Sequence, residues 1–388
     1  MMNFNNRIYF NGRPSQDEQE TAKRKGYPLT LSLSLGAKGS RGRICDLACE
    51  GCYAVNLRND SCEKFENKKK LSMEDACEII KKFKNIGGKY VITAGPGEPF
   101  LDSLFYNRKT FLNKVTGSLF PLLDYAVELG LHWTFFTNMT ALYDETLANE
   151  LVKRKDNLSV IGKLHTLNPE LHDKLVGGKG KYSKINCVRV GNNEYIPIGL
   201  HNLIKNGFQE VKKELGKSVT NLGVEVNMFK QNYKDIPRVT EWCVENGIYP
   251  NIEGLEIAGD AIQKESKLKL SSKEKVWLEN KLEGILGKEF FYDRIGTTDF
   301  CYSFQGLTLD QYGNAKVCFV VDDMAEYNVK KYGVKGVWYK IEKTRSKITD
   351  YVESQMERDI CLLPECRLGI LASKLPKRLF LKNTVKKK

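Results

Sequence analysis

The chain has 388 residues, 41% of them hydrophobic and 28% charged, and a formal net charge of +13. This composition is typical of a soluble globular protein, and the length favours one large domain plus a smaller one. The sequence has no apolar run of about 18 residues and no signal-peptide pattern, which excludes a membrane span and predicts a cytoplasmic protein.

The first predicted elements lie on either side of a group of three cysteines. Leucine alternates with polar residues over 29–35, which predicts a strand. Residues 72–83 predict a helix, because Ser72 and Asp75 have the spacing of a capping box and apolar residues follow on one face. The short apolar run 89–94 predicts a second strand, buried on both faces.

Helical and strand-like patterns then alternate through the middle of the chain. The further predicted strands are 132–138, 158–166, 222–229 and 251–259. Six strands separated by helices imply parallel pairing through right-handed crossovers, in a doubly wound sheet or a barrel. Both architectures place the active site at the C-terminal ends of the strands. The alternation stops near residue 262, and residues 177–197 have no clear pattern and are expected to form an inserted loop.

Seven of the eleven cysteines are clustered, which in a reducing compartment indicates metal binding or redox chemistry. Cys45, Cys49 and Cys52 follow the first strand with C-x3-C-x2-C spacing. These three thiolates could bind zinc, with Cys62 or a histidine as the fourth ligand. They could also hold three irons of a [4Fe–4S] cluster and leave the fourth iron open to a substrate or cofactor.

The triad with an aromatic residue directly after it, Tyr53, resembles the signature of the radical S-adenosylmethionine (SAM) enzymes. The resemblance implies that SAM chelates the open iron and that Tyr53 lies near this cofactor. It also implies reductive cleavage of SAM to a 5′-deoxyadenosyl radical, which abstracts a hydrogen from the substrate. The implied fold is α/β, a partial (β/α)6 TIM-like barrel over residues 29–262.

The segment "GPGEP" after the second strand is similar to the family's glycine-rich motif. The similarity implies that Gly95, Gly97 and Glu98 receive the methionine ammonium of SAM. Glycine allows a close approach of the backbone, and a carboxylate accepts charge-assisted hydrogen bonds from an amine.

Two later segments resemble the family's remaining cofactor contacts. Thr137 and Asn138 resemble its "TNG" motif and imply contacts to the ribose, although Met139 stands in place of the glycine. Ala258 and Gly259 in "IAGDA" resemble the segment that lies along the adenine.

Candidates for catalytic residues come only from position at or near the ends of predicted strands. They are Lys163, His165, Glu225 and Glu253, and Lys163 and His165 are expected to point at the mouth of the barrel. Lys163 and His165 could also be ordinary residues of a solvated loop.

A second group of cysteines comprises Cys301, Cys318, Cys361 and Cys366. The turn "QYGN" between the first two predicts a hairpin that brings their thiols together. A closed four-thiolate zinc site is one interpretation. The pattern C-x11-G-x4-C with a later cysteine pair is similar to the SPASM/twitch extension of the superfamily, which implies one auxiliary [4Fe–4S] cluster in a small α+β domain.

The predicted organisation is an N-terminal segment (1–28), the radical SAM barrel (29–262), a helical linker (263–299), the auxiliary-cluster domain (300–372) and a basic tail (373–388). The implied function is hydrogen abstraction from a peptide, protein, sugar or nucleotide, with the auxiliary cluster assisting oxidation or bond formation. A flavodoxin or ferredoxin would supply electrons.

Two alternatives use the positive charge differently. One is a radical SAM enzyme that modifies RNA, and the other is a zinc-stabilised basic protein that binds nucleic acid. A basic surface attracts RNA, but no RNA-binding motif with interleaved aromatic residues accompanies the charge.

Overall fold

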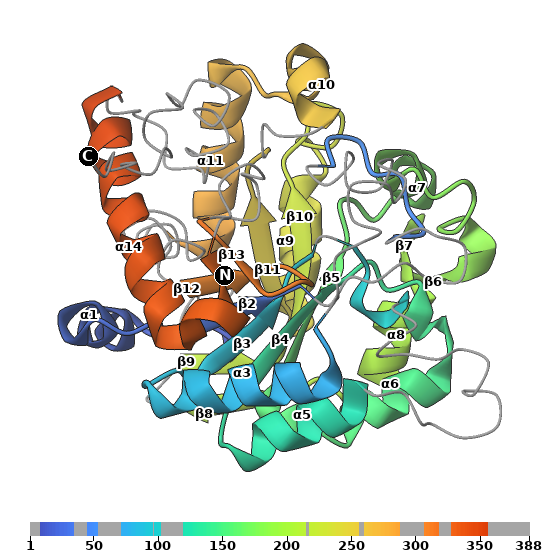
Figure 1. The fold of residues 1–388 in the computed structure, drawn as a ribbon. Coiled ribbons are helices and arrows are strands. Elements are labelled where there is room, and N and C mark those ends of the chain that lie inside the picture. The colour runs from blue at the N-terminus through green and yellow to red at the C-terminus, as the bar shows by residue number, and fades with distance from the viewer. Residues whose placement is uncertain are drawn as a thin grey trace.

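The computed structural model describes residues 8–34, 45–52, 71–95, 97–101, 119–214, 217–255, 260–287, 306–317 and 327–355 (Figure 1). Its fold is α/β, centred on a nine-stranded sheet in the order β11-β10-β5-β4-β3-β2-β12-β13-β14. The first seven strands in this order are mutually parallel. β13 (Asn314–Lys316) and β14 (Tyr327–Asn328) are antiparallel additions at one edge. No described helix is long and apolar enough to cross a lipid bilayer.

All six strands predicted from the hydrophobic pattern are present as neighbours in this sheet. Their bounds are β2 (Thr30–Leu33), β3 (Tyr90–Thr93), β4 (His132–Thr137), β5 (Leu158–Lys163), β10 (Leu222–Asn227) and β11 (Tyr249–Glu253). The last strand begins two residues earlier than predicted and ends six residues earlier. A seventh parallel strand, β12 (Gly306–Leu309), pairs with β2 and was not predicted.

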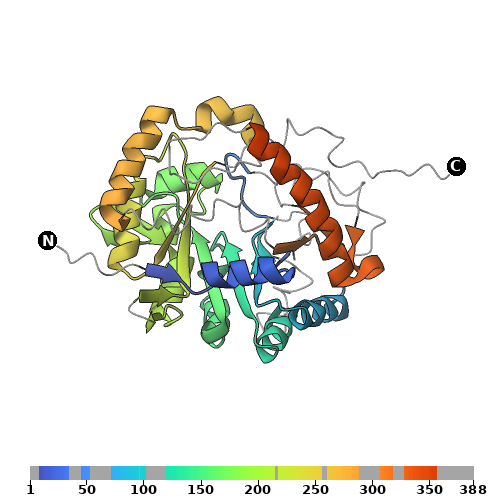
Figure 2. The same ribbon diagram turned by 90° about the vertical axis from the view of Figure 1, so that its left-hand side faces the viewer.

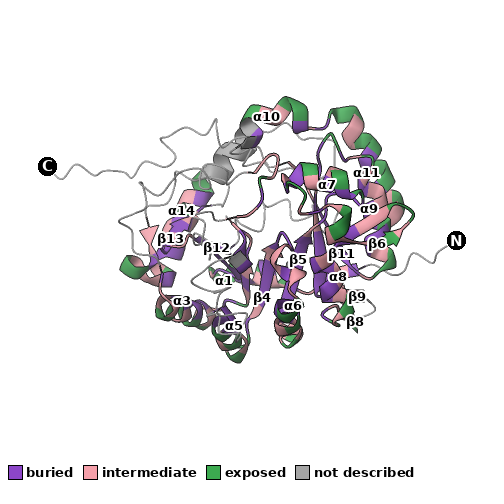
Figure 3. Cartoon of the chain, turned by 90° about the vertical axis from the view of Figure 1, so that its right-hand side faces the viewer, coloured by how far each residue is buried: buried purple, intermediate pink, exposed green. Residues whose placement is uncertain are grey.

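The helices lie around the outside of the strands in an open arc (Figures 2 and 3). Ser72 and Asp75 form the predicted capping box at the start of α3, with both reciprocal hydrogen bonds present. The α-helices are α1 (Gln16–Lys25), α3 (Met73–Asn85), α5 (Leu119–Glu128), α6 (Glu145–Val152), α7 (Pro169–Val176), α8 (Ile198–Lys205), α9 (Ile236–Glu245), α10 (Asp260–Leu268), α11 (Ser272–Leu286) and α14 (Val329–Gln355).

The two faces of the sheet differ in chemistry because side chains alternate along a strand. Val160 of β5 and Val224 of β10 belong to the main hydrophobic core between sheet and helices. In each of these two strands the alternate residues point to the opposite, inner face of the sheet. That face therefore carries Lys163 and Glu225. Polar and charged groups are thus collected on the inner face at the C-terminal ends of the strands.

The N-terminal segment forms structure that the sequence pattern did not reveal. β1 (Ile8–Phe10) pairs in parallel with β9 (Lys217–Thr220), which forms a hairpin with β8 (Val211–Glu214). Phe10 packs with Ile161 of β5 and Tyr249 of β11. This segment therefore covers the inner face of the sheet toward the strands' N-terminal ends.

The interpretation of residues 177–197 as an inserted loop is wrong in its second half. β6 (Cys187–Gly191) and β7 (Glu194–Pro197) form an antiparallel hairpin. Asn193 lies in its turn with a positive φ of 58°. Asparagine tolerates this conformation, so the asparagine pair between two strand-like runs was the available signal.

Candidate functional site

The three cysteines of the triad lie on a loop that rests on the C-terminal end of α7. Ala48 N donates a hydrogen bond to Val176 O (3.1 Å), and Glu50 N donates to Leu175 O (2.8 Å). Gly177 ends α7 in the left-handed conformation. A Cβ atom at Gly177 would lie 2.3 Å from Ala48 O, so the loop can approach the helix only over a glycine.

Gly177→Ala should therefore displace the cysteine loop. The added methyl group combines left-handed strain with a backbone clash, and we expect a loss of about 1–3 kcal/mol in unfolding free energy. Iron incorporated per chain on reconstitution should also fall. Gly207→Ala is the matched control, because Gly207 has a φ of 76° but nothing within 4 Å of its would-be Cβ. Equal iron incorporation in the two variants would contradict this role of Gly177.

Cys45, Cys49 and Cys52 are partly buried thiols. Burial raises the pKa of Cys45 to about 12 and that of Cys49 to about 11, so both are protonated at neutral pH in the absence of metal. Three thiols are the donor set of a thiolate-bound metal or iron–sulfur centre, and they would release protons on binding it. Among the described residues, no three His, Cys, Asp or Glu side chains are close enough to surround a single metal ion.

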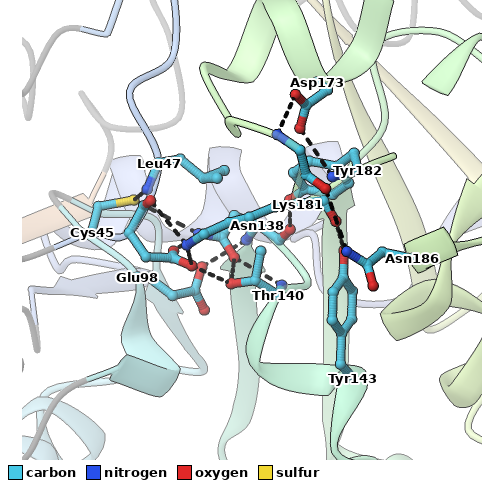
Figure 4. A network of polar contacts seen from close by, with 12 residues as sticks. Cys45, Leu47, Glu98, Asn138, Thr140, Tyr143, Asp173, Lys181, Tyr182 and Asn186 are labelled. Carbon is cyan, nitrogen blue, oxygen red and sulfur yellow. Dashed lines mark hydrogen bonds and ion pairs between the residues drawn. The ribbon is translucent and has the colours of Figure 1, made fainter. Parts of the chain in front are cut away.

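A network of polar contacts joins the cysteine loop to the end of β4 (Figure 4). The carboxylate of Asp46 accepts hydrogen bonds from Asn138 Nδ2 (2.7 Å) and Thr140 Oγ1 (2.9 Å), and it forms an ion pair with Lys181. Asn138 Nδ2 also lies 3.7 Å from Cys45 Sγ. Asp46, Thr140 and Lys181 were missed in the sequence because none belongs to a spaced motif.

Hydrogen bonds also fix the position of the loop that carries Lys181. Asp173 accepts hydrogen bonds from two backbone N–H groups of this loop, at 2.7 and 3.0 Å. The buried Tyr182 donates its hydroxyl to Asn138 O, and the Tyr143 hydroxyl donates to Lys181 O (2.7 Å). The contacts that fix Cys45 therefore extend from the end of β4 to the residues after α7.

Glu98 of "GPGEP" is buried, with 2% of its surface exposed. Its carboxylate accepts hydrogen bonds from Asn138 N (2.6 Å), Thr137 Oγ1 (2.7 Å) and Phe100 N (3.4 Å). Burial nevertheless raises the pKa of Glu98 to about 7, because its effect exceeds that of the three hydrogen bonds. Three predicted SAM-binding residues thus contact one another, and their contacts with SAM stay predictions.

Gly95 and Gly97 of the same motif both have positive φ angles, 104° and 106°. L-residues rarely adopt these conformations, so this backbone path favours glycine at both positions. The turn by itself explains both glycines. A close approach of SAM to them remains a prediction.

Met139, which stands where "TNG" has a glycine, adopts a left-handed backbone conformation that favours glycine. Its φ is 68°, and its side chain is fully buried. A Cβ atom at Gly162 would lie 1.6 Å from Met139 Cε, so the methionine side chain occupies the space that Gly162 leaves open. The two residues form a complementary pair at the ends of β4 and β5.

Gly162→Ala should destabilise the protein by about 1–3 kcal/mol, because the methyl group would overlap a buried side chain. Met139→Gly also costs stability because it removes a buried side chain, but in the double variant the total loss should be less than the sum, since Met139→Gly frees the space and removes the left-handed strain. Chemical denaturation of both single variants and the double variant gives the coupling energy. Strictly additive losses would show that the two residues do not compete for this space.

Two of the four catalytic candidates form an ion pair. Lys163 Nζ lies 3.2 Å from Glu225 Oε2, and each side chain is about a fifth exposed. Burial lowers the pKa of Lys163, but the Glu225 carboxylate together with Cys49 and Cys52 raises it by more, so the net shift is upward. The positive charge of Lys163 in turn lowers the pKa of Cys49, against the larger effect of burial. The pair is therefore close enough to the triad to affect it electrostatically.

The other two candidates differ in access. Glu253 ends β11 with 40% of its side chain exposed, and it lies 3.8 Å from Arg13 Nη2. His165 is 1% exposed, and its Nδ1 accepts a hydrogen bond from Asn227 N (3.2 Å). Burial lowers the pKa of His165 well below its usual value. The prediction that His165 points at the mouth of the barrel is wrong, because its ring is buried against His172 and Phe229.

The predicted hairpin near the second cysteine group is confirmed. β12 and β13 (Asn314–Lys316) pair in antiparallel fashion, and Asp310 Oδ1 accepts hydrogen bonds from Tyr312 N and Asn314 N in the turn. Arg345 of α14 donates to Gly306 O and Val317 O at the two ends of this hairpin. The predicted site residues outside the described part of the chain are Tyr53, Ala258, Gly259, Cys301, Cys318, Cys361 and Cys366, and Cys62 also lies there.

Residues 40–211 match the family model of the Radical SAM superfamily. No curated protein matches the chain. The matched segment contains the triad, "GPGEP" and the end of β4, and it stops before β10, β11 and the β12–β13 hairpin. The match supports a radical SAM domain in this segment, and such a domain indicates an enzyme that uses an iron–sulfur cluster and SAM. The match therefore disfavours the non-enzymatic zinc protein.

Proposed function

We propose that Cys45, Cys49 and Cys52 hold a [4Fe–4S] cluster whose open iron binds SAM, at the C-terminal ends of a partial (β/α)6 barrel. The observation that carries this proposal is the meeting of three segments far apart in sequence. Asn138 at the end of β4 bonds both to Asp46 beside Cys45 and, through its backbone, to Glu98 of "GPGEP". When bound, the cluster and SAM supply a 5′-deoxyadenosyl radical for hydrogen abstraction.

Side chains of the protein position the first cysteine thiol and provide a carboxyl group for the methionine ammonium of SAM. The Asp46 network fixes the first thiol. Glu98 holds a carboxyl group without a cationic hydrogen-bond donor among the described residues, so an arriving ammonium would favour its ionised form. Thr137 and Asn138 orient that carboxyl group through hydrogen bonds. Gly95, Gly97 and Tyr53, with Ala258 and Gly259, complete the proposed SAM contacts.

The proposed substrate is polar, a peptide or protein or a sugar- or nucleotide-type molecule. The inner face of the sheet supports this, because Lys163, Glu225 and Glu253 are charged and still partly exposed there. These three are the remaining candidates for contact with the reacting substrate.

The proposal further includes one auxiliary [4Fe–4S] cluster on Cys301, Cys318, Cys361 and Cys366, in a domain over 300–372. The hairpin between the first two cysteines supports it. Such a cluster would assist oxidation or bond formation, and a flavodoxin or ferredoxin would supply the electrons.

The test is anaerobic reconstitution followed by reaction with SAM and dithionite. The protein should carry about eight irons and eight sulfides, as two four-iron clusters, and should form 5′-deoxyadenosine and methionine slowly even without substrate. A protein that holds its full iron and binds SAM, yet forms no 5′-deoxyadenosine under reduction, would refute the proposed function.

A further inference from the structure

Helix α14 has one buried and one exposed side. Its buried side packs on the main core through Val334, Val337 and Ile341. Its exposed side carries residues spaced by four, which brings them into line on a helix. We name these the outer stripe: Lys331, Lys335, Tyr339, Lys343 and Lys347. Gly333 interrupts the helix with a φ of 66°, so the members from Lys335 onward share one continuous helix.

The lysines of the outer stripe make no ion pair with a carboxylate in the described part of the chain. Lysines on other helices do so: Lys82 pairs with Glu78 at 3.0 Å, and Lys205 pairs with Glu145 at 3.0 Å. The outer stripe therefore presents positive charge that nearby carboxylates do not neutralise. A long-range attraction for acidic molecules follows from such a field.

Tyr339 lies in the middle of the outer stripe with 57% of its surface exposed. The Lys335 ammonium lies 6.0 Å from the centre of its ring. Large exposed aromatic side chains are unusual on a free surface and are enriched in protein–protein interfaces. The arrangement is that of a contact surface with an aromatic residue at its centre and cations on both sides.

Helix α14, which carries the outer stripe, is hydrogen-bonded to the hairpin that leads into the proposed auxiliary-cluster cysteine Cys318. From the buried side of α14, Arg345 bonds to both ends of the β12–β13 hairpin, and Val317 directly precedes Cys318. β12 pairs along its length with β2, the strand that leads to the cysteine loop. A molecule docked on α14 would thus lie on the helix that holds the β12–β13 hairpin, whose last described residue, Val317, precedes the proposed auxiliary-cluster ligand Cys318.

We infer that the outer stripe is the docking surface for the acidic one-electron carrier, a flavodoxin or ferredoxin, that reduces this enzyme. The inference rests on the proposed function. The carrier loses one electron, and the iron–sulfur centre of the enzyme gains it. From Lys335 to Lys347 the stripe spans about 18 Å, which suits the small, transient interfaces of electron-transfer partners.

The experiment compares two reductants in the reconstituted full-length protein. Lys335→Glu with Lys343→Glu should lower the rate of 5′-deoxyadenosine formation driven by reduced flavodoxin at least about tenfold at low salt. Dithionite-driven formation should stay unchanged, because dithionite needs no docking surface. Added salt should slow the wild type more than the variant.

A second variant controls for net charge. Lys213→Glu with Lys273→Glu makes the same change in charge, on β8 and on α11, and α11 lies on the opposite side of the molecule from α14 (Figure 3). This control should keep the flavodoxin-driven rate within about twofold of wild type. Binding of flavodoxin measured by calorimetry should weaken only in the α14 variant.

The outcomes distinguish failure of the proposed function from failure of the docking inference. Absence of 5′-deoxyadenosine with dithionite in wild type would remove the proposed function itself. Equal flavodoxin-driven rates in the α14 variant and the wild type would overturn the docking inference alone. So would a variant that loses binding to tRNA, used as a nucleic-acid probe, while its flavodoxin-driven rate is unchanged.

Discussion

Replacement of Cys45, Cys49 and Cys52 together by alanine should abolish 5′-deoxyadenosine formation and remove about half of the bound iron. The reason is chemical, because the three thiolates are the proposed protein ligands of one four-iron cluster. The other four cysteines of the clustered set stay in place, so about four irons should remain. Iron and sulfide analysis with product chromatography measures both effects.

Cys187→Ala is the matched control for this triple variant. Cys187 is a partly buried thiol that packs against the same apolar cluster as Cys45 and Cys49, yet it is not a proposed ligand. It should keep all of its iron and its product formation. Retention of the full iron content in the triple variant would disprove the assignment of the triad as ligands.

Glu98→Gln should weaken SAM binding roughly ten- to a hundredfold without changing the iron content. Loss of one charge-assisted hydrogen bond to the methionine ammonium costs about 1.5–3 kcal/mol. The glutamine can still accept from Asn138 N and donate to Thr137 Oγ1, so most of the local structure should survive. Calorimetry of SAM binding to the reconstituted protein is the measurement, and an unchanged affinity would mean that "GPGEP" is only a turn.

The same variant should change the pH dependence of stability. The pKa of Glu98 rises from its usual value of 4.5 to about 7 on folding, so between these pH values the folded state binds more protons than the unfolded state. The stability that Glu98 contributes is complete below about pH 4.5 and is lost as pH rises through about 7. Wild type should lose up to about 1.4 kcal/mol per pH unit relative to Glu98→Gln in this range. Parallel pH profiles of the two proteins would contradict the raised pKa.

The sequence by itself determined the order of strands and the place of the cysteines. The alternation over 29–35 predicts that the leucine side of the strand is buried in the core, and the leucines of β2 are buried in the structure. Capping chemistry at Ser72 is local, so it could be predicted without the fold. The triad and "GPGEP" were likewise visible because their residues are adjacent in the chain.

Tertiary structure alone decided which side chains meet. The contacts of Asp46 with Thr140 and Lys181 join residues more than ninety positions apart, and no periodicity encodes such pairings. The same holds for the ion pair of Lys163 with Glu225 across two parallel strands. Burial of His165 depends on the packing of distant residues around its ring, so its position at a strand end was an unreliable guide. Local sequence fixes elements and motifs, whereas packing between elements fixes the environment of each functional group.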